Sequence, residues 1–339
     1  MKLNGGILTE SGVYFVLCET SDCDEDEAII SAGRPDGSTL NLRPLTSAKE
    51  FVSLIPLAVD WGGPHKAAAI TAQGEFFLLG EDSSESQLIP GSGFGRRDSE
   101  NLGRMTALKQ VGAELFALGY GGQVYRRTAA ARWSPNHVDA RTIAPGVKPC
   151  LYDVVKGPGG NFYFGGIDLA KFERTQEIID ADKNKDLKRW AELLRTKRAT
   201  DRMGLRYYDG SWHQIDIEYQ GAITVMIETE ARAWTLFSNY GVAWRTKDFQ
   251  SFDEVVALGG GRKFWDVKQI AGQTFVMVGQ QLNEMRAGEL VAFDPPLPPR
   301  RDGYTNFTGN SAQLAAFHEK GIVENRGEDW TRLRVTLAT

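Results

Sequence analysis

Titratable side chains are numerous in this chain, but few have the spacing that catalysis or metal binding requires. The four histidines are widely separated, and none has a second histidine or a glutamate at metal-ligand spacing. The sequence also lacks the G-x-S-x-G turn that presents a serine nucleophile. We therefore expect no metal and no other cofactor. We expect surface or hydrogen-bonded roles for His65, His137, His213 and His318.

Two short runs have the composition of ligand-binding loops without their spacing. Residues 20–27, TSDCDEDE, crowd five carboxylates together but lack the central glycine and terminal glutamate of an EF-hand loop. Residues 90–97, PGSGFGRR, match neither a dinucleotide fingerprint nor a Walker loop. We expect solvated loops in both places, including solvated Arg96 and Arg97. The acidic run leaves a cation site or a basic partner open, with Asp22, Asp24, Glu25 and Asp26 as the candidate contacts.

A recurring phrase indicates which elements must position these residues. It consists of a turn residue, three to five β-prone residues, and a glycine or small polar residue. Its seven copies end at positions 18, 80, 119, 165, 238, 279 and 318. Four of the six gaps are near the roughly 40 to 50 residues of a four-stranded propeller blade. The gaps of 62 and 73 residues must therefore contain insertions.

The repeat predicts an all-β fold, a seven-bladed β-propeller with six or eight blades as alternatives. A ring protects strand edges that a flat array would expose, so we expect residues 1–339 to form a single domain. Residues 66–70, KAAAI, suit the crowded centre as an inner strand, and residues 47–57 could form a short helix or an extra strand. Residues 4–10 and 331–337 would be the first and last strands, closing the ring by packing without an exchanged strand.

Two blade ends, residues 246–252 (TKDFQSF) and 326–330 (RGEDW), resemble degenerate copies of the Asp-box turn. That motif occurs in several propeller families, including sialidases and photosystem assembly factors. The chain is thus similar to degenerate Asp-box or WD40-like propellers. The resemblance covers these turns and the approximate period, and every copy of the box is incomplete. Because the Asp-box is a structural turn, the resemblance implies a propeller and no glycosidase activity.

The longest gap contains the clearest non-β segment. We expect a helical insertion over residues 168–204, in the fourth blade, with a polar run at 180–185 dividing it into two helices. Apolar residues at helical spacing would form one stripe on the second helix: Leu187, Trp190, Leu193 and Leu194. The insertion either packs on its own propeller or docks a partner. The candidate contacts are Lys188, Arg189, Trp190 and Arg195.

Composition disfavours several classes of protein. The net charge of −5 argues against a nucleic-acid-binding surface. There is no run of 18 apolar residues, and the first residues lack the apolar core of a signal peptide. Three cysteines match neither a disulfide framework nor a zinc knuckle. We expect a cytoplasmic monomer that binds neither nucleic acid nor membranes.

Two functional interpretations remain open. The leading one is a non-enzymatic propeller that binds a dedicated protein partner. Its specific form is a bacterial immunity protein that neutralises a basic toxin domain. The alternative is an enzyme of the hydrolase or lyase type, or a small-ligand binder, that uses the central funnel. Three charged groups within about 5 Å of one point would favour this alternative. The candidates are Asp60, Arg104, Asp153, Arg262 and Asp266.

Overall fold

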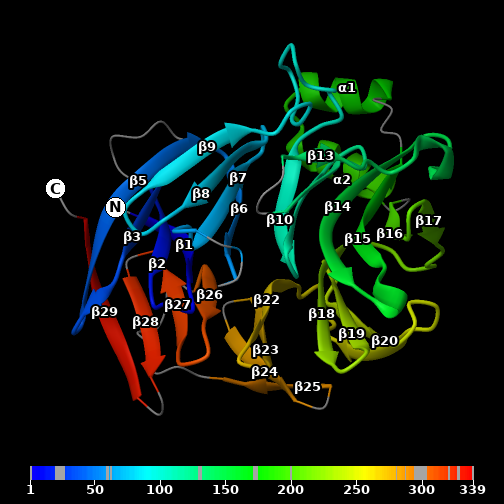
Figure 1. Cartoon of the computed structure of the whole chain (residues 1–339). Helices are drawn as coiled ribbons and strands as arrows, with labels where there is room; N and C mark the ends of the chain where they lie inside the picture. Colours follow the sequence, from blue (N-terminus) through cyan, green and yellow to red (C-terminus); the bar gives the residue numbers. More distant parts are fainter. Residues whose placement is uncertain are drawn as a thin grey trace.

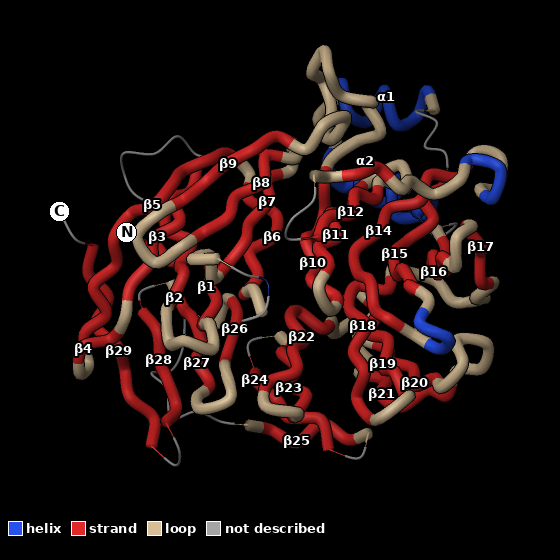
Figure 2. The backbone as a smooth tube through the Cα atoms, viewed as in Figure 1, coloured by secondary structure: helices blue, strands red, loops and turns tan. Residues whose placement is uncertain are grey.

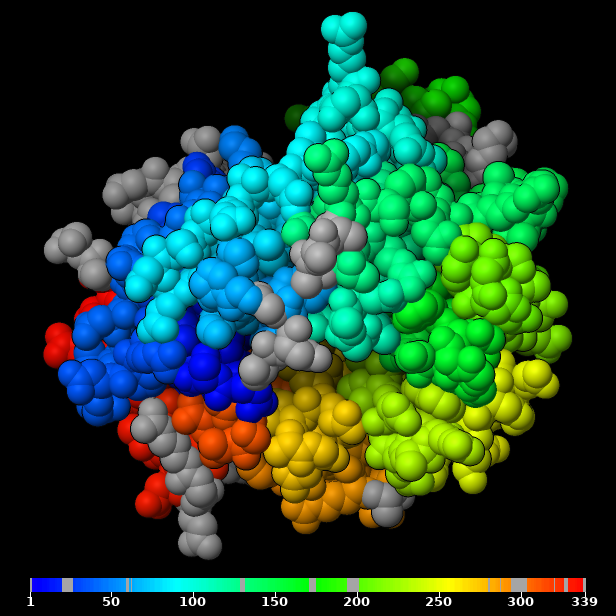
Figure 3. All heavy atoms as spheres, viewed as in Figure 1, coloured from blue at the N-terminus to red at the C-terminus, as the bar shows by residue number. Residues whose placement is uncertain are grey.

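A computed structural model shows an all-β propeller whose sheets follow one another around a central axis (Figure 1). It describes residues 2–19, 27–58, 61, 63–128, 132–170, 175–198, 201–279, 281–286, 288–293, 304–319, 321–326 and 329–337. Figure 2 shows strands nearly everywhere and helices at one part of the periphery. In the space-filling view, the colours run around a rounded body, so the two ends of the chain are neighbours (Figure 3).

Five of the sheets are separate four-stranded antiparallel meanders. The first consists of β6 (Phe51–Pro56), β7 (Ala67–Thr71), β8 (Glu75–Leu79) and β9 (Ser84–Leu88). The second consists of β10 (Met105–Val111), β11 (Glu114–Gly119), β12 (Val124–Thr128) and β13 (Ser134–Pro135). The third is β14 (Val147–Lys156), β15 (Phe162–Ala170), β16 (Arg202–Tyr208) and β17 (Trp212–Ile215). The fourth consists of β18 (Ile223–Glu230), β19 (Ala233–Ser238), β20 (Val242–Thr246) and β21 (Asp253–Ala257). The fifth consists of β22 (Phe264–Ile270), β23 (Gln273–Val278), β24 (Gln281–Arg286) and β25 (Glu289–Ala292).

The two ends of the chain share a sixth, nine-stranded sheet. Its N-terminal part is β1 (Lys2–Leu8), β2 (Tyr14–Glu19), β3 (Glu27–Gly33), β4 (Pro35–Asp36) and β5 (Thr39–Lys49). Its C-terminal part is β26 (Asn306–Gly309), β27 (Leu314–His318), β28 (Gly321–Arg326) and β29 (Asp329–Leu337). β29 pairs in parallel with β5, with Arg334 opposite Thr39 and Leu337 opposite Leu42. The expectation of seven separate blades is therefore corrected to five separate blades and one joined sheet.

The inner strands form a closed ring. β1, β6, β10, β14, β18, β22 and β26 each contact the next, and β26 contacts β1. Side chains of β26 bond the backbone of β1 at this junction: Thr308 Oγ1 accepts from Leu8 N at 3.0 Å, and Asn306 Nδ2 donates to Gly6 O at 3.2 Å. The ring thus closes by packing and hydrogen bonds between β1 and β26. The parallel β5–β29 ladder, which we did not predict, adds a second closure at the outer edge.

The core consists of apolar clusters between neighbouring sheets, so second strands such as β2 contribute apolar residues to clusters on both faces. Phe116 of one sheet meets Phe164 of the next edge-on, for example, with ring centroids 6.0 Å apart. This burial explains one wrong prediction. The alanine-rich segment is β7, a fully buried second strand, and the inner strand of its sheet is the half-buried β6. An inner strand faces the central channel, so it cannot be as completely buried as β7.

Two helices, α1 (Gln176–Lys183) and α2 (Leu187–Arg198), lie in the connection between β15 and β16. The expected helical pair is therefore present. Its assignment to a fourth blade is not supported, because the sheets do not divide into seven separate blades. Short 3₁₀ turns occur at Ala140–Thr142 and Pro158–Gly160. Among the described residues, no helix has the length and hydrophobicity needed to cross a bilayer.

Candidate binding face

Strand order assigns every connection to one of two ends of the ring. In an antiparallel meander, the first strand starts at the same end at which the second strand turns into the third. The fourth strand returns to this end before the next sheet begins. We call it the entry end. The β2–β3, β9–β10, β13–β14, β15–β16, β21–β22 and β25–β26 connections belong to it.

The connections at the two ends differ in length. Counted between the described strands, the four longest intervals of sequence are 89–104, 136–146, 171–201 and 293–305, and all four belong to the entry end. At the opposite end most connections are tight turns, such as residues 112–113, 231–232 and 271–272. Long loops on a rigid scaffold are where binding residues concentrate. The entry end is therefore the candidate binding face.

The loop at residues 89–104 is tied down by its own side chains. Arg96 donates hydrogen bonds to Gln73 O and Ser92 O, both at 2.9 Å, so the prediction of a solvated Arg96 was wrong. Gly93 has φ +76°, and a Cβ there would lie 2.5 Å from Gln73 O. Gly93 thus permits a close approach to the backbone of Gln73. The loop leaves Phe94 exposed.

The helical insertion presents basic residues on the entry end. α1 buries Ile178 and Ala181, and Asp186 begins α2 by accepting a hydrogen bond from Arg189 N at 3.0 Å. Lys188 and Arg189 are exposed, and Leu187 is 76% exposed. Trp190 is half-buried, so the expected apolar stripe is only partly covered. The backbone of Arg195 belongs to α2, but its side chain lies outside the described part of the structure.

The acidic candidates Asp22, Asp24, Glu25 and Asp26 lie outside the described residues. The strand residues on either side of them are Glu19 and Glu27, which end β2 and begin β3. These two residues belong to the entry end. Glu19 and Glu27 therefore lie on the same face as the helices, and the role of the four acidic candidates as contacts stays a prediction.

Three exposed aromatic residues on this face were missed in the sequence. Tyr219 stacks on Trp244 with centroids 4.7 Å apart, Tyr240 lies in the β19–β20 turn, and Trp265 is the second residue of β22. Trp265 is 67% exposed and Tyr240 is 52% exposed. None of the three has a core position: Tyr219 and Tyr240 lie in connections between strands, and Trp265 lies near the start of an inner strand. The preceding glycine-rich turn, Gly259–Gly261, was the signal that the chain is at the surface before Trp265.

Two of the candidate funnel acids join inner strands to one another. Six of the seven inner strands have a register shift typical of a β-bulge, near the first residues in five of them and in the middle of β14. Asp153 and Asp266 each follow such a bulge, and Asn306 begins β26. Each accepts a hydrogen bond from a backbone N–H of the next inner strand: Asp153 from Met226 at 2.7 Å, Asp266 from Phe307 at 3.4 Å, and Asn306 from Gly6 at 3.3 Å.

The other funnel candidates do not converge on these acids. Arg104 pairs with Glu50 at 3.1 Å, and Arg262 donates to Leu258 O from Nε and Nη2, at 3.1 and 2.5 Å. Asp60 lies outside the described residues. No hydrogen bond or ion pair between described side chains joins any two of the remaining four. Within the same residues, no group of three His, Cys, Asp or Glu side chains could hold a metal.

Two buried polar clusters lie near the entry end. The Cys150 thiol is fully buried and interacts with the Tyr152 and Tyr120 hydroxyls, and burial raises its pKa to about 12. Asp168 and Arg206 form a buried pair, with Arg206 Nη2 2.7 and 2.9 Å from the two carboxylate oxygens. Burial raises the pKa of Asp168, against the opposing effect of the guanidinium. This pair joins β15 to β16 below the helices.

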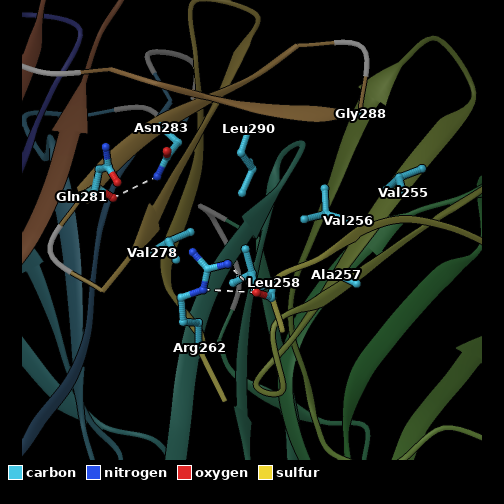
Figure 4. Close-up of a pocket in the computed structure, with 10 residues that line it drawn as sticks. All are labelled: Val255, Val256, Ala257, Leu258, Arg262, Val278, Gln281, Asn283, Gly288 and Leu290. Carbon is cyan, nitrogen blue, oxygen red and sulfur yellow. Dashed lines mark hydrogen bonds between the residues drawn. The ribbon is translucent and has the colours of Figure 1, made fainter. Parts of the chain in front are cut away.

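A pocket of about 320 Å³ lies between the outer parts of two neighbouring sheets (Figure 4). β21 and Leu258 form one wall, and residues of β24 and β25 form the other. Arg262 lies at this pocket, with its guanidinium turned towards Leu258 (Figure 4). The sequence placed Arg262 at the funnel, whereas the structure places it beside an interblade pocket.

Comparisons with solved structures show the propeller fold and little sequence similarity. A structure of YCF48 bound to D1 peptide is 12% identical, covering 97% of this chain and 92% of that one, with a TM-score of 0.57. A catalytically inactive virginiamycin B lyase from Staphylococcus aureus with quinupristin is 9% identical, covering 91% and 88%, with a TM-score of 0.56. The RRP9 WD40 repeats are 10% identical, covering 98% and 91%, with a TM-score of 0.52.

No protein-family model matches the chain, and no curated protein matches it. At such low identities the structural likeness is one of fold alone. The three propellers also differ in what their names describe, a peptide complex, a lyase and a set of repeats. The function of this chain has to be argued from its own residues.

Proposed function

We propose that this protein is a non-enzymatic propeller that binds a protein partner through its entry end. The observation that carries the proposal is the gathering of the four longest connections at that end, while the opposite end has mostly tight turns. A closed ring cannot easily move its strands, so variable contacts are built from loops. The proposal includes a monomeric state and a cytoplasmic location, which sedimentation and cell fractionation of the native source would test.

The chemistry of the entry end supports a macromolecular partner. Exposed Tyr240 and Trp265 have the side chains that are enriched at the energetic centres of protein interfaces. Exposed Leu187 adds an apolar group on the helical insertion, and Lys188 and Arg189 add charge next to it. An interface core of aromatic groups with a charged rim is the usual anatomy of such a surface. The fold likeness to a propeller solved with a peptide is consistent with this use.

The test is partner capture from the native source with two matched pairs of substitutions. Tyr240→Ala with Trp265→Ala removes exposed side chains from the entry end. Arg232→Ala with Lys247→Ala removes exposed side chains from turns at the opposite end. We expect the first pair to weaken binding of the captured protein at least about 30-fold, the size of a hot-spot loss, and the second pair to leave it unchanged. Loss of the partner with the second pair alone would overturn the proposal.

A separate variant locates the contribution of the helical insertion. Asp168 and Arg202 are opposite each other in adjacent strands, so residues 171–200 can be replaced by a short glycine-containing turn. The propeller should keep its cooperative thermal unfolding, since both strands remain paired, while the helical signal in its circular dichroism spectrum is lost. Loss of the partner on this replacement would assign the interface to the helices. Retention would assign it to the aromatic residues and the other loops.

Toxin neutralisation is the specific form of the proposal that the acidic run favours. This form is supported by the four negatively charged residues Asp22, Asp24, Glu25 and Asp26. Replacing these four carboxylates with amides should weaken binding of a basic toxin domain and reduce the dependence of that binding on salt. Identification of a partner without toxic activity would reject this form and leave the binding function intact.

The enzyme interpretation lacks a supporting arrangement among the described residues. Asp153 and Asp266 are committed to bonds between inner strands, and Arg104 and Arg262 have other partners. The lyase neighbour shares the fold without showing a shared site. Turnover of a small substrate by the purified protein would reverse this assignment. The non-enzymatic character therefore belongs to the proposal.

A further inference from the structure

The interblade pocket is lined by aliphatic side chains, by polar groups that make up most of its exposed surface, and by one cationic group. Its aliphatic walls are Val255, Val256 and Leu258 on one side and Val278 and Leu290 on the other. These residues continue the hydrophobic cluster between the two sheets, which includes the buried Phe237 and Val276. The volume of about 320 Å³ is at the lower end of the range found for small-molecule sites.

Arg262 supplies hydrogen-bond donors at one part of this pocket. Its Nε and Nη2 both donate to Leu258 O, which holds the guanidinium against the β21 side. A guanidinium has five N–H groups, so donors remain for a ligand. Within the described residues, no carboxylate forms an ion pair with Arg262, and the pocket lining contains no acidic side chain. Its charge is therefore available to an anion.

Asn283 supplies an acceptor on the opposite wall. The side chain is only 7% exposed, and its Nδ2 donates to Gln281 O at 3.1 Å and to Val276 O at 3.4 Å. These two bonds fix the amide so that the other atom, Oδ1, is the free acceptor. No donor among the described residues bonds this oxygen. Figure 4 shows Asn283 and Arg262 on opposite sides of Val278.

We propose that the pocket binds an N-acylated aliphatic amino acid through its free carboxylate. The carboxylate would bond Arg262, the amide N–H would donate to Asn283 Oδ1, and the branched side chain would lie among Val278, Leu258 and Leu290. The charge-assisted hydrogen bond to the guanidinium would give orientation and much of the affinity, and contact with the aliphatic walls would add to the affinity. The same chemistry occurs in a free acylated amino acid and at the carboxyl end of a peptide. This inference does not depend on the proposed partner at the entry end.

Calorimetric titration of the full chain with N-acetyl-leucine tests the proposal. We expect saturable 1:1 binding, weakened about tenfold or more for N-acetyl-leucinamide, which lacks the carboxylate. N-acetyl-glycine should also bind more weakly, because it lacks the side chain. These comparisons use the unaltered protein, so they remain decisive if a pocket variant misfolds. No binding of N-acetyl-leucine, or equal binding of the amide, would overturn the proposal.

Substitutions then locate the site. Arg262→Gln should weaken N-acetyl-leucine about tenfold or more, whereas Arg97→Gln, the same change at an exposed loop residue, should have no effect. Equal effects of the two variants would reject the pocket as the site. A peptide ending in Ala-Ala-Leu distinguishes the two sources of the ligand. Tighter binding than N-acetyl-leucine indicates a peptide end, and equal or weaker binding indicates the free molecule.

Discussion

At the scale of single residues, burial decides which groups are chemically active. Cys18 and Cys150 are both fully buried, and burial raises their pKa values to about 11 and about 12. A thiol reacts as its thiolate, so such residues are inert in the folded protein. The sequence excluded a disulfide framework and a zinc knuckle, which is compatible with buried thiols. Sequence reasoning could not find the tyrosine hydroxyls beside Cys150, because Tyr120 belongs to a different sheet.

The burial of the two thiols can be tested in a Cys23→Ser variant, which lacks the third cysteine. A thiol reagent at pH 8 should label neither Cys18 nor Cys150 in native buffer and both in denaturant. The folded chain holds both protons more tightly than the unfolded chain. The resulting stabilisation is therefore complete below the ordinary thiol pKa of 9.0 and is lost as the pH rises towards 11 and 12. Rapid labelling of the folded protein would contradict this.

The charged residues show the limit of sequence reasoning at this scale. Asp153 and Asp266 were selected because they are acidic and stand in expected inner strands, and the structure places both there. Their role depends on a backbone N–H of another strand, 73 and 41 residues away. A sequence does not display such a partner. Arg262 likewise depends on the groove that β24 and β25 form beside it.

At the scale of elements, the inner strands are joined by side chains as well as by packing. Asp153 of β14 links its own strand to two others. Its carboxylate accepts a hydrogen bond from Met226 N of β18 and forms an ion pair with Lys109 of β10 at 3.1 Å. The carboxylate is nearly completely buried. Asp266 and Asn306 repeat the bond to the next strand. The channel wall is therefore a continuous hydrogen-bonded structure along part of the ring.

Asp153→Ala should lower the free energy of unfolding by about 3 kcal/mol, since it leaves Met226 N–H unsatisfied and Lys109 unpaired. Asp153→Asn keeps an oxygen acceptor and should cost less. Urea denaturation measures both, with Glu254→Ala on the exposed part of β21 as the control. An effect of Asp153→Ala no larger than that of the control would show that the carboxylate does not join the strands.

The elements themselves were predicted well where the apolar pattern was strong. Second strands such as β11 and β19 were located correctly because both of their faces are buried. The sheet of β6 to β9 was misphased by one strand. There the buried third strand β8 carries the apolar phrase, and the inner strand β6 is only half-buried. Helix α2 was recognisable from the spacing of its apolar residues, but the partial exposure of those residues was not.

At the scale of the whole molecule, the two ends of the chain form one core. Leu3, Leu8 and Tyr14 of the N-terminal strands pack in the same cluster as Phe317 and Leu333 of the C-terminal strands. Tyr14 also donates a hydrogen bond to Glu324 Oε2 at 2.8 Å. The stability of the closed ring therefore depends on the packing at this junction. The existence of a closed ring was predictable from the repeat, but the parallel pairing of β5 with β29 was not.

Leu333→Ala tests the junction, because it removes a buried side chain of β29. We expect a loss of about 2 to 5 kcal/mol in the free energy of unfolding. Hydrogen exchange should also accelerate at residues 39–42 of β5, which pair with β29. Leu88→Ala, on the partly exposed outer strand β9, is the control and should change neither quantity appreciably. Unchanged exchange in β5 with Leu333→Ala would mean that β29 does not hold that edge.

The junction also sets an order of events during synthesis. Asn41 and Thr336, which bond across it, are 295 residues apart. At about 5 to 20 residues per second, the outer edge of β5 waits roughly 15 to 60 s for its partner to be made. Throughout that time a nascent chain displays an unpaired strand edge, the kind of surface that recruits other strands. A chain terminated before β29 would therefore present a permanent site for aggregation, and only chains that include β29 conceal it.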